Sequence, residues 1–320
     1  MAPTVALIKR LLGAACEACY DPENRGAMMR FGLLTPVVFR PPGQANPWEE
    51  HGDVADVVAV AQAADALGYH HLTCSEHVVV PAAAAARRGS TYWDPLATLA
   101  FLAAETEQIR LATHVLVLGY HHPLAIAKRY GTLDRLSNGR LILGLGVGTL
   151  QEEFELLGAA FADRGARADD ALAALRASWG RPVPEYHGAY YDYAGLAVDP
   201  HSRRPDVPIW VGGSTARSLR RAIDFGDGWV PFGLAPQALH EMLGRVRLPS
   251  AFDVIFECPG LDPRGRPDET RAAVKARFAA GATIVNVAFR HDSAQDCVEQ
   301  LHSFKELFPE ARWSRTDLAP

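Results

Sequence analysis

Eight short apolar runs, each followed by a segment with a helical pattern, fill the sequence from Arg30 onward and restrict the folds open to this chain. Continuous apolar runs of this length are typical of parallel strands that are buried on both faces. The pattern predicts an α/β fold, a closed (β/α)8 TIM barrel, with an open doubly wound sheet as the alternative. The runs are FGLLTPV, YHHLTCS, IRLATHVLVL, RLILGLGVG, PIWVGG, DGWVPFG, FDVIFECP and TIVNVAFR.

Helices between these runs carry recognisable start and stop signals. Asp94 and Pro95 are a cap and a first-turn proline, and Pro123 begins another helix that Asn138 and Gly139 should end. We expect the remaining helices at 55–67, 169–179, 214–225, 236–246, 268–280 and 294–307.

One connection is much longer than the others. Some sixty residues, 150–207, separate the fourth and fifth strands and include the aromatic segment HGAYYDYAG. Connections of that length are usually functional. We predict an N-terminal extension at 1–29, one barrel domain at 30–310, and an insertion at 150–207 that forms a helix and a lid over the barrel mouth. The pair Met28 and Met29 is an alternative start.

Composition excludes several classes of function. The 320 residues carry a net charge of -5 with scattered Arg and Lys, which argues against a nucleic-acid or anionic-membrane surface. No apolar run is long enough to span a bilayer. Five cysteines, with one Cys16-x-x-Cys19 pair and no second ligand pair, indicate reduced thiols and no metal site. We expect a cytoplasmic protein with a small-molecule substrate.

The second strand ends abruptly on Ser75, Glu76 and His77. In a (β/α)8 barrel the active site lies at the carboxyl ends of the strands, so polar side chains there are candidates for catalysis. A neutral imidazole at His77 can give or take a proton near neutral pH. The alternative is a histidine that only solvates the strand end.

Glycines follow the fourth and fifth strands. LGLGVGT places Gly144, Gly146 and Gly148 on one side of a strand, where they let a flat ligand or a neighbouring backbone approach, and Thr149 stands where a dinucleotide motif needs glycine. In WVGGSTARS, Gly212 and Gly213 lead into a helix that we expect Ser214 to cap. The free amides at that helix start predict an anion site, and tight packing or a plain helix cap is the alternative.

Several motifs together resemble the luciferase-like flavin-dependent oxidoreductases. They are TCSEHVVVP, the stretch from Asp94 to Gly158, HGAYYDY, and RPDVPIWVGGSTARSLRRAIDFGDGWVPFG. The resemblance runs from about Arg30 to Gly233 and is strongest to the branch that uses the deazaflavin coenzyme F420. It implies a (β/α)8 barrel that holds a flavin or deazaflavin across the strand ends, often as a homodimer.

The resemblance also implies site residues. It places Glu76 against the cofactor and His77 at its reactive carbon, and it matches His114 and Val115 to a non-prolyl cis peptide that supports the ring. The cofactor's side chain and phosphate would lie along two glycine-rich segments, which hold Gly146, Gly148 and Thr149, and Val211, Gly212, Gly213 and Ser214. Leu150 departs from sugar-phosphate dehydrogenase relatives, which have an acidic residue about there, so that substrate is not expected.

We therefore expect an F420-dependent oxidoreductase in which His77 supplies or removes a proton during hydride transfer. An FMN-dependent monooxygenase and a non-catalytic flavin-binding protein are the alternatives. A metal hydrolase would place histidines on the first strand, which has none. A glycosidase would need paired carboxylates, for which Glu152, Glu153 and Glu257 are available, although the first two more simply open a helix.

Overall fold

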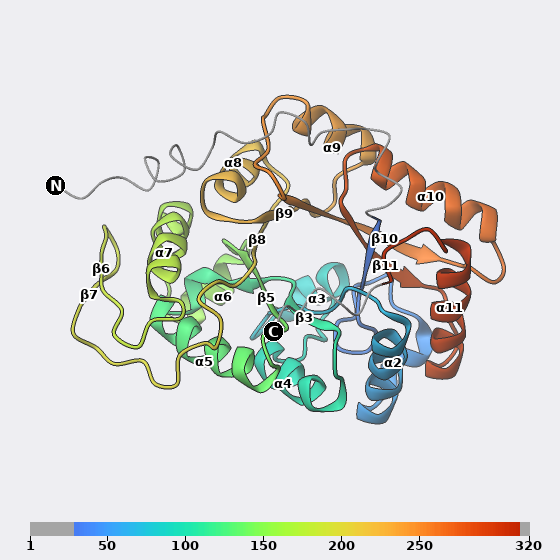
Figure 1. The fold of residues 1–320 in the computed structure, drawn as a ribbon, viewed down its shortest axis with the longest axis horizontal. Helices are drawn as coiled ribbons and strands as arrows, with labels where there is room; N and C mark the ends of the chain where they lie inside the picture. Colours follow the sequence, from blue (N-terminus) through green and yellow to red (C-terminus); the bar gives the residue numbers. More distant parts are fainter. Residues whose placement is uncertain (1–28, 314–320) are drawn as a thin grey trace.

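The computed structural model describes residues 29–313, which form a closed parallel barrel. Its strands follow the order β3-β2-β1-β11-β10-β9-β8-β5-β4, and an added β3–β5 pairing closes the ring (Figure 1). All the barrel pairings are parallel. The strands are β1 (Arg30–Leu33), β2 (His71–Cys74), β3 (Arg110–Thr113), β4 (Leu116–Val117), β5 (Leu141–Gly146), β8 (Ile209–Gly212), β9 (Gly228–Val230), β10 (Asp253–Leu261) and β11 (Ile284–Phe289).

The TIM-barrel prediction is confirmed, with each of the eight apolar runs supplying one barrel strand. The third run is divided into β3 and β4 by a cis peptide between His114 and Val115. Because β3 pairs with β2 and β5 while β4 pairs only with β5, the two pieces act as one position in the barrel.

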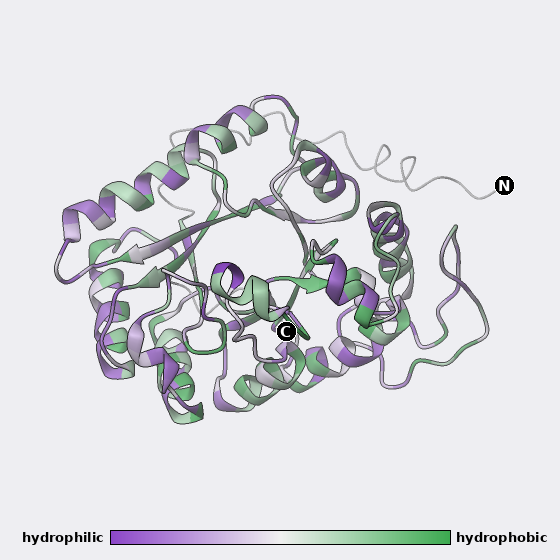
Figure 2. Cartoon of the chain, turned by 180° about the vertical axis from the view of Figure 1, so that it is seen from behind, coloured by the Kyte–Doolittle hydropathy of each residue, from purple (hydrophilic) through white to green (hydrophobic). Residues whose placement is uncertain are grey.

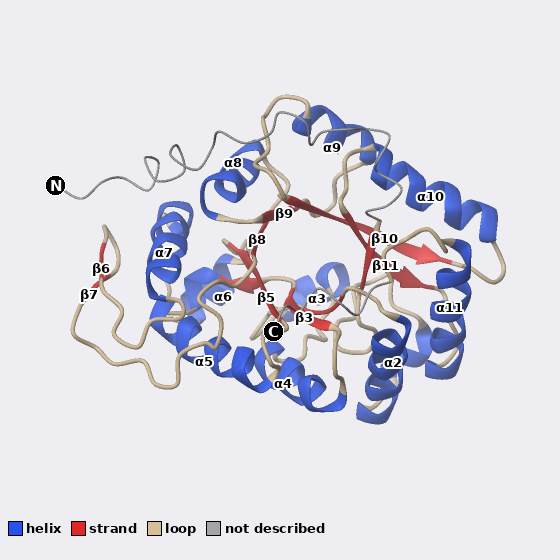
Figure 3. Ribbon diagram, viewed as in Figure 1, coloured by secondary structure: helices blue, strands red, loops and turns tan. Residues whose placement is uncertain are grey.

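Helices surround the barrel on its outside (Figure 3). Three additional short elements, α3 (Ala82–Arg88), η2 (Pro47–Glu50) and η3 (Leu118–Tyr120), lie in the connections that follow β2, β1 and β4, and the sequence pattern did not predict them. The helices are α2 (Val54–Leu67), α3 (Ala82–Arg88), α4 (Pro95–Glu105), α5 (Pro123–Leu136), α6 (Gln151–Leu156), α7 (Arg164–Ser178), α8 (Ala216–Phe225), α9 (Pro236–Leu243), α10 (Pro267–Ala279) and α11 (Ala294–Leu307), with the 3-10 helices η2 (Pro47–Glu50) and η3 (Leu118–Tyr120).

Most of the predicted caps are present, and one is wrong. Asp94 accepts a hydrogen bond from Ala97 N at 2.8 Å, and α5 ends just before Asn138 and Gly139, both in the left-handed region. The N-cap of α8 is Thr215 and not Ser214, because the Thr215 hydroxyl accepts the bond from Ser218 N.

Two apolar layers hold the fold together. The larger lies between the barrel and the helices, which alternate hydrophobic and hydrophilic residues along their length (Figure 2). The smaller fills part of the barrel, and each large side chain buried there contributes about 1.5–3 kcal/mol. Its members are Ala112, Ile142, Trp210, Val230, Ile255 and Ile284.

The 150–207 insertion does not form a lid over the barrel mouth. After α6 and α7 it makes a hairpin of β6 (Tyr186–His187) and β7 (Asp192–Tyr193) that lies at the periphery beside α7 (Figure 1). Asp170 of α7 accepts hydrogen bonds from the Tyr186 hydroxyl at 2.6 Å and from Tyr190 N at 2.7 Å. The aromatic segment is therefore bound to an outer helix.

Within residues 29–313, no helix is both long and apolar enough to cross a membrane. The same residues contain no cluster of three or more His, Cys, Asp or Glu side chains placed to hold a metal ion. The pair Cys16 and Cys19 and nearly all of the predicted extension at 1–29 lie outside the described residues.

Candidate active site

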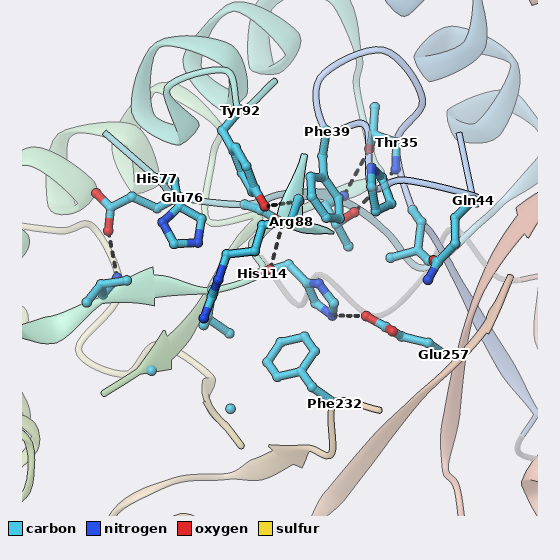
Figure 4. Close-up of a pocket in the computed structure, with 18 of the residues that line it drawn as sticks. Thr35, Phe39, Gln44, Glu76, His77, Arg88, Tyr92, His114, Phe232 and Glu257 are labelled. Carbon is cyan, nitrogen blue, oxygen red and sulfur yellow. Dashed lines mark hydrogen bonds and ion pairs between the residues drawn. The ribbon is translucent and has the colours of Figure 1, made fainter. Parts of the chain in front are cut away.

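A cavity of about 450 Å³ opens at the carboxyl ends of the strands, within the size range of small-molecule sites (Figure 4). Nine of the eleven predicted site residues line it, although they come from four separate parts of the chain. They are Glu76, His77, His114, Val115, Gly146, Gly148, Thr149, Gly212 and Gly213.

The other two predicted residues do not line this cavity. Val211 is buried in the layer between barrel and helices, where a Cβ on Gly226 would lie 3.2 Å from its side chain. Successive residues of a strand face opposite sides, so Val211 points outward where Gly212 points inward. Ser214 is exposed beyond the end of β8.

The glycines beside the cavity make room for protein atoms. A Cβ on Gly144 would lie 2.0 Å from the carbonyl oxygen of Thr113, and one on Gly146 would lie 2.7 Å from Val115 Cγ2. Gly148 has φ +75° and faces Phe154. The prediction that small residues admit a neighbouring backbone is confirmed for Gly144, and Gly146 admits the side chain after the cis peptide.

Glu76 lines the cavity, but both of its carboxylate oxygens are already bound by the protein. Val117 N donates to Oε2 at 2.6 Å, and His121 Nε2 lies 2.7 Å from Oε1. Figure 4 shows the carboxylate turned away from His114 and Arg88. Glu76 thereby holds β4 and the following turn against the end of β2.

His77 is held by a buried acid from another element. Its Nδ1 lies 2.6 Å from Oε2 of Glu153 on α6, and the Glu153 side chain is 0% exposed. Burial acts to raise the pKa of Glu153, but hydrogen bonds from His77 and Tyr120 outweigh it and hold that pKa below its usual value. An ionised carboxylate at Nδ1 fixes the tautomer of the ring, so Nε2 is free to exchange a proton.

Sequence reasoning missed Glu153 because an acid in the first turn of a helix is usually explained by the helix dipole. The carboxylate also accepts from Val78 N at 2.6 Å and from the Tyr120 hydroxyl at 2.7 Å. Its position just after the glycine loop of β5, at the carboxyl edge of the barrel, was the available signal. Since Glu153 is bound to His77 and Glu152 is exposed on α6, the two do not form a glycosidase pair.

Arg88 was also missed, and it brings a positive charge to the cavity from α3. Its Nη1 lies 3.2 Å from Thr149 Oγ1, while its Nε is buried and has no partner among the described residues. An unpaired buried donor of a cationic side chain can bind an anionic group.

His114 and Glu257 lie at the other end of the cavity. His114 Nε2 is 3.8 Å from Glu257 Oε1, and the Phe232 ring packs edge-on against the imidazole. Burial lowers the pKa of His114 to about 4 and raises the pKa of Glu257 to about 7. Between about pH 4 and pH 7 both groups are therefore largely uncharged.

Comparison with known proteins places this architecture in a family. The sequence model of the luciferase-like monooxygenase family matches residues 29–304. The chain belongs to that family. The resemblance seen in the sequence is confirmed.

Relatives of this luciferase-like protein are named for two kinds of coenzyme. It is 33% identical over 156 residues, 45% of each chain, to a Mycobacterium tuberculosis protein provisionally named a coenzyme F420-dependent oxidoreductase. It is 25% identical over 194 residues, 59% of this chain and 52% of the relative, to the oxygenase component of a flavin-dependent trigonelline monooxygenase from Acinetobacter baylyi. A monooxygenase structure from Streptomyces bottropensis superposes with a TM-score of 0.70 and 22% sequence identity. The superposition covers 87% of this chain and 98% of that structure.

The cavity of this luciferase-like protein fits a flat ring with an anionic side chain. Val115, Val117 and Phe232 provide apolar surface for a ring. The orphaned Nε of Arg88, beside Thr149 and Gly148, provides a donor for an anionic group. A flavin or a deazaflavin meets both requirements.

Proposed function

We propose that this protein is a coenzyme F420-dependent oxidoreductase that transfers a hydride between the deazaflavin and a small organic substrate, with His77 as the proton donor and acceptor. The relative named for F420 supports the choice of coenzyme. The paired His77 and Glu153 support the proton role and carry the proposal.

The coenzyme, when bound, supplies the hydride chemistry. The protein's contribution is to orient it and to manage one proton. Gly148, Thr149 and Arg88 would hold its anionic side chain, and Val115 with the cis peptide would support its ring. His77 Nε2 would exchange the proton while Glu153 stabilises the imidazolium that forms.

A second candidate is an FMN-dependent monooxygenase, which the trigonelline monooxygenase relative favours. A non-catalytic flavin-binding protein is a third, and it predicts coenzyme binding without turnover. The proposal also includes a cytoplasmic homodimer, whose mass light scattering would measure.

Titration of the purified protein with F420, FMN and FAD tests the choice of coenzyme. Absorbance and fluorescence of each coenzyme report binding, and we expect F420 to bind most tightly. Preferential tight binding of FMN would instead support the monooxygenase.

Substitution His77→Ala tests the proton role. We expect coenzyme affinity within about twofold of wild type and a loss of turnover of roughly 10²–10⁴-fold, the usual contribution of general acid–base catalysis. Coenzyme reduction by a panel of small alcohols supplies the assay. His302→Ala, at an exposed position on α11, is the matched control. Turnover that survives His77→Ala contradicts the role.

A further inference from the structure

Glu257 differs from the other acids that line the cavity. Glu49 accepts hydrogen bonds from Val37 N and Asn46 N at 2.9 Å each, and both Glu76 oxygens are bound as described. Between residues 29 and 313, the structure gives the Glu257 carboxylate no hydrogen bond, and its recorded contact is His114 Nε2 at 3.8 Å. This acid therefore has acceptor and donor capacity to offer a ligand.

Strand pairing holds the backbone of Glu257, and its carboxyl group takes no part in that pairing. Glu257 lies opposite Asn286 in the β10–β11 register, and Asn286 Nδ2 lies 3.2 Å from His114 Nε2. The imidazole is thus held by Asn286. Figure 4 shows the Glu257 side chain reaching into the cavity from the side opposite His77. With 28% of its surface exposed there, the carboxyl group is accessible to a small molecule.

Among residues 29–313, no cation is paired with this carboxyl group. Arg88 lies at the Thr149 end of the cavity, and Arg277 on α10 donates to the backbone oxygens of Glu257 at 3.5 Å and of Ala273 at 3.2 Å. Burial raises the pKa of Glu257 to about 7, and the neighbouring His114 has its pKa lowered to about 4. Across the cavity, Glu49 is held by backbone amides. The electrostatic surroundings favour the neutral acid.

The cavity has two chemically different ends. The predicted cofactor residues Gly148 and Thr149 lie at the end that carries Arg88, whose Nη1 is 3.2 Å from Thr149 Oγ1. The loop after β1 lines the cavity with mostly apolar side chains, one hydroxyl and one amide, and Figure 4 shows its Gln44 on the same side as Glu257. Its lining residues are Leu34, Thr35, Pro36, Phe39, Pro41, Gln44 and Ala45.

We propose that Glu257 binds the substrate by donating a hydrogen bond, as a neutral carboxylic acid, to an uncharged oxygen such as a ketone carbonyl. This rests on the proposed function, because it assumes that the coenzyme occupies the Arg88 end. The substrate class is a small neutral carbonyl compound or the matching alcohol, with an apolar body. Carboxylates, which meet no cation among the described residues at this end, are excluded from it, and ammonium compounds are excluded while Glu257 is neutral.

Three probes that share a six-membered carbon ring and differ in their polar group test the proposal. They are cyclohexanone, cyclohexanecarboxylate and cyclohexylammonium. Ligand-observed NMR measures their binding to the protein with and without coenzyme at pH 6 and pH 8. We expect cyclohexanone to bind best at pH 6 and about tenfold more weakly at pH 8, because the neutral fraction of an acid of pKa about 7 falls by that factor. Better binding of cyclohexylammonium than of cyclohexanone at pH 6, or no binding of cyclohexanone at pH 6, overturns it.

Variants assign the effect to this residue. Glu257→Gln keeps a neutral donor, so cyclohexanone should bind at pH 6 within about threefold of wild type and lose its pH dependence; Glu257→Leu should lose binding at both pH values. Glu152→Gln on exposed α6 is the control. An unchanged pH dependence in Glu257→Gln contradicts the proposal. Coenzyme titration separates the two hypotheses, because a protein that binds the ketone probe but neither F420 nor FMN defeats only the proposed function.

Discussion

The Nδ1 atom of His77 lies 2.6 Å from Oε2 of Glu153, which joins the end of β2 to helix α6 across 76 residues of sequence. The pair lies at one edge of a cavity whose other wall carries His114 and Glu257. Each of these relationships makes a measurable prediction.

Glu153→Gln should impair chemistry more than coenzyme binding. The amide cannot stabilise an imidazolium at His77, so we expect turnover to fall by roughly 10²–10⁴-fold while coenzyme affinity changes little. Loss of a buried charged acceptor should also lower the free energy of unfolding by about 1–3 kcal/mol. Coenzyme reduction kinetics and urea unfolding measure the two effects. Glu152→Gln is the adjacent exposed control, and equal losses in both variants would refute a specific role.

Arg88→Gln should weaken binding of a phosphorylated coenzyme. A charge-assisted hydrogen bond contributes about 1.5–3 kcal/mol, so we expect FMN to bind roughly 10–100-fold more weakly. Riboflavin, which lacks the phosphate, should bind with unchanged affinity. Arg87→Gln, at an exposed neighbouring position on α3, is the control. A parallel loss for riboflavin and FMN would mean that Arg88 shapes the cavity and does not contact the anion.

Gly144→Ala should destabilise the barrel. The new Cβ would lie 2.0 Å from the Thr113 carbonyl oxygen, a backbone atom that can move only with β3. We expect the free energy of unfolding to fall by about 1–3 kcal/mol, as for other overpacked cores. Gly244→Ala is the control, because its Cβ would meet nothing closer than 3.4 Å and its φ is -63°. Urea midpoints measure both variants, and similar midpoints would contradict the clash.

Acid should destabilise the protein through buried histidines. Burial lowers the pKa values of His70, His71 and His114, so below about pH 6.5 the unfolded chain binds up to three more protons at these sites. Stability present above that pH is lost as the pH falls. Glu257, with its raised pKa, opposes this because it binds its proton more tightly when folded. Each net proton contributes about 1.4 kcal/mol per pH unit.

Glu257 changes the stability in the direction opposite to the buried histidines as the pH falls. A variant without Glu257 can therefore be compared with wild type to separate the two effects. Glu257→Gln removes the group whose stabilisation is lost as the pH rises from about 4.5 to 7. Between pH 4.5 and 6.5, the stability of this variant should therefore rise more steeply with pH than that of wild type, by about 1.4 kcal/mol per unit. Urea unfolding at half-unit intervals measures both slopes, and parallel slopes would show that Glu257 is ionised in the folded protein.

The sequence allowed the barrel to be predicted because strands buried on both faces leave continuous apolar runs. It also indicated the edge at which His77, His114 and Thr149 meet. It did not indicate that Glu153 reaches His77, since contacts between distant segments leave no periodic signal. Val211 was misplaced because the motif was carried over as a block, while alternate residues of β8 face opposite sides. The expected lid failed because Asp170 binds the aromatic hairpin to α7.

The β6–β7 hairpin stands clear of the chemistry, and that separation has a practical use. A fluorophore or an affinity tag attached between Tyr186 and Tyr193 would sit on the outer rim, tethered to α7, with no described residue of the hairpin lining the cavity. A label at this place would leave the cavity and its reaction unaltered.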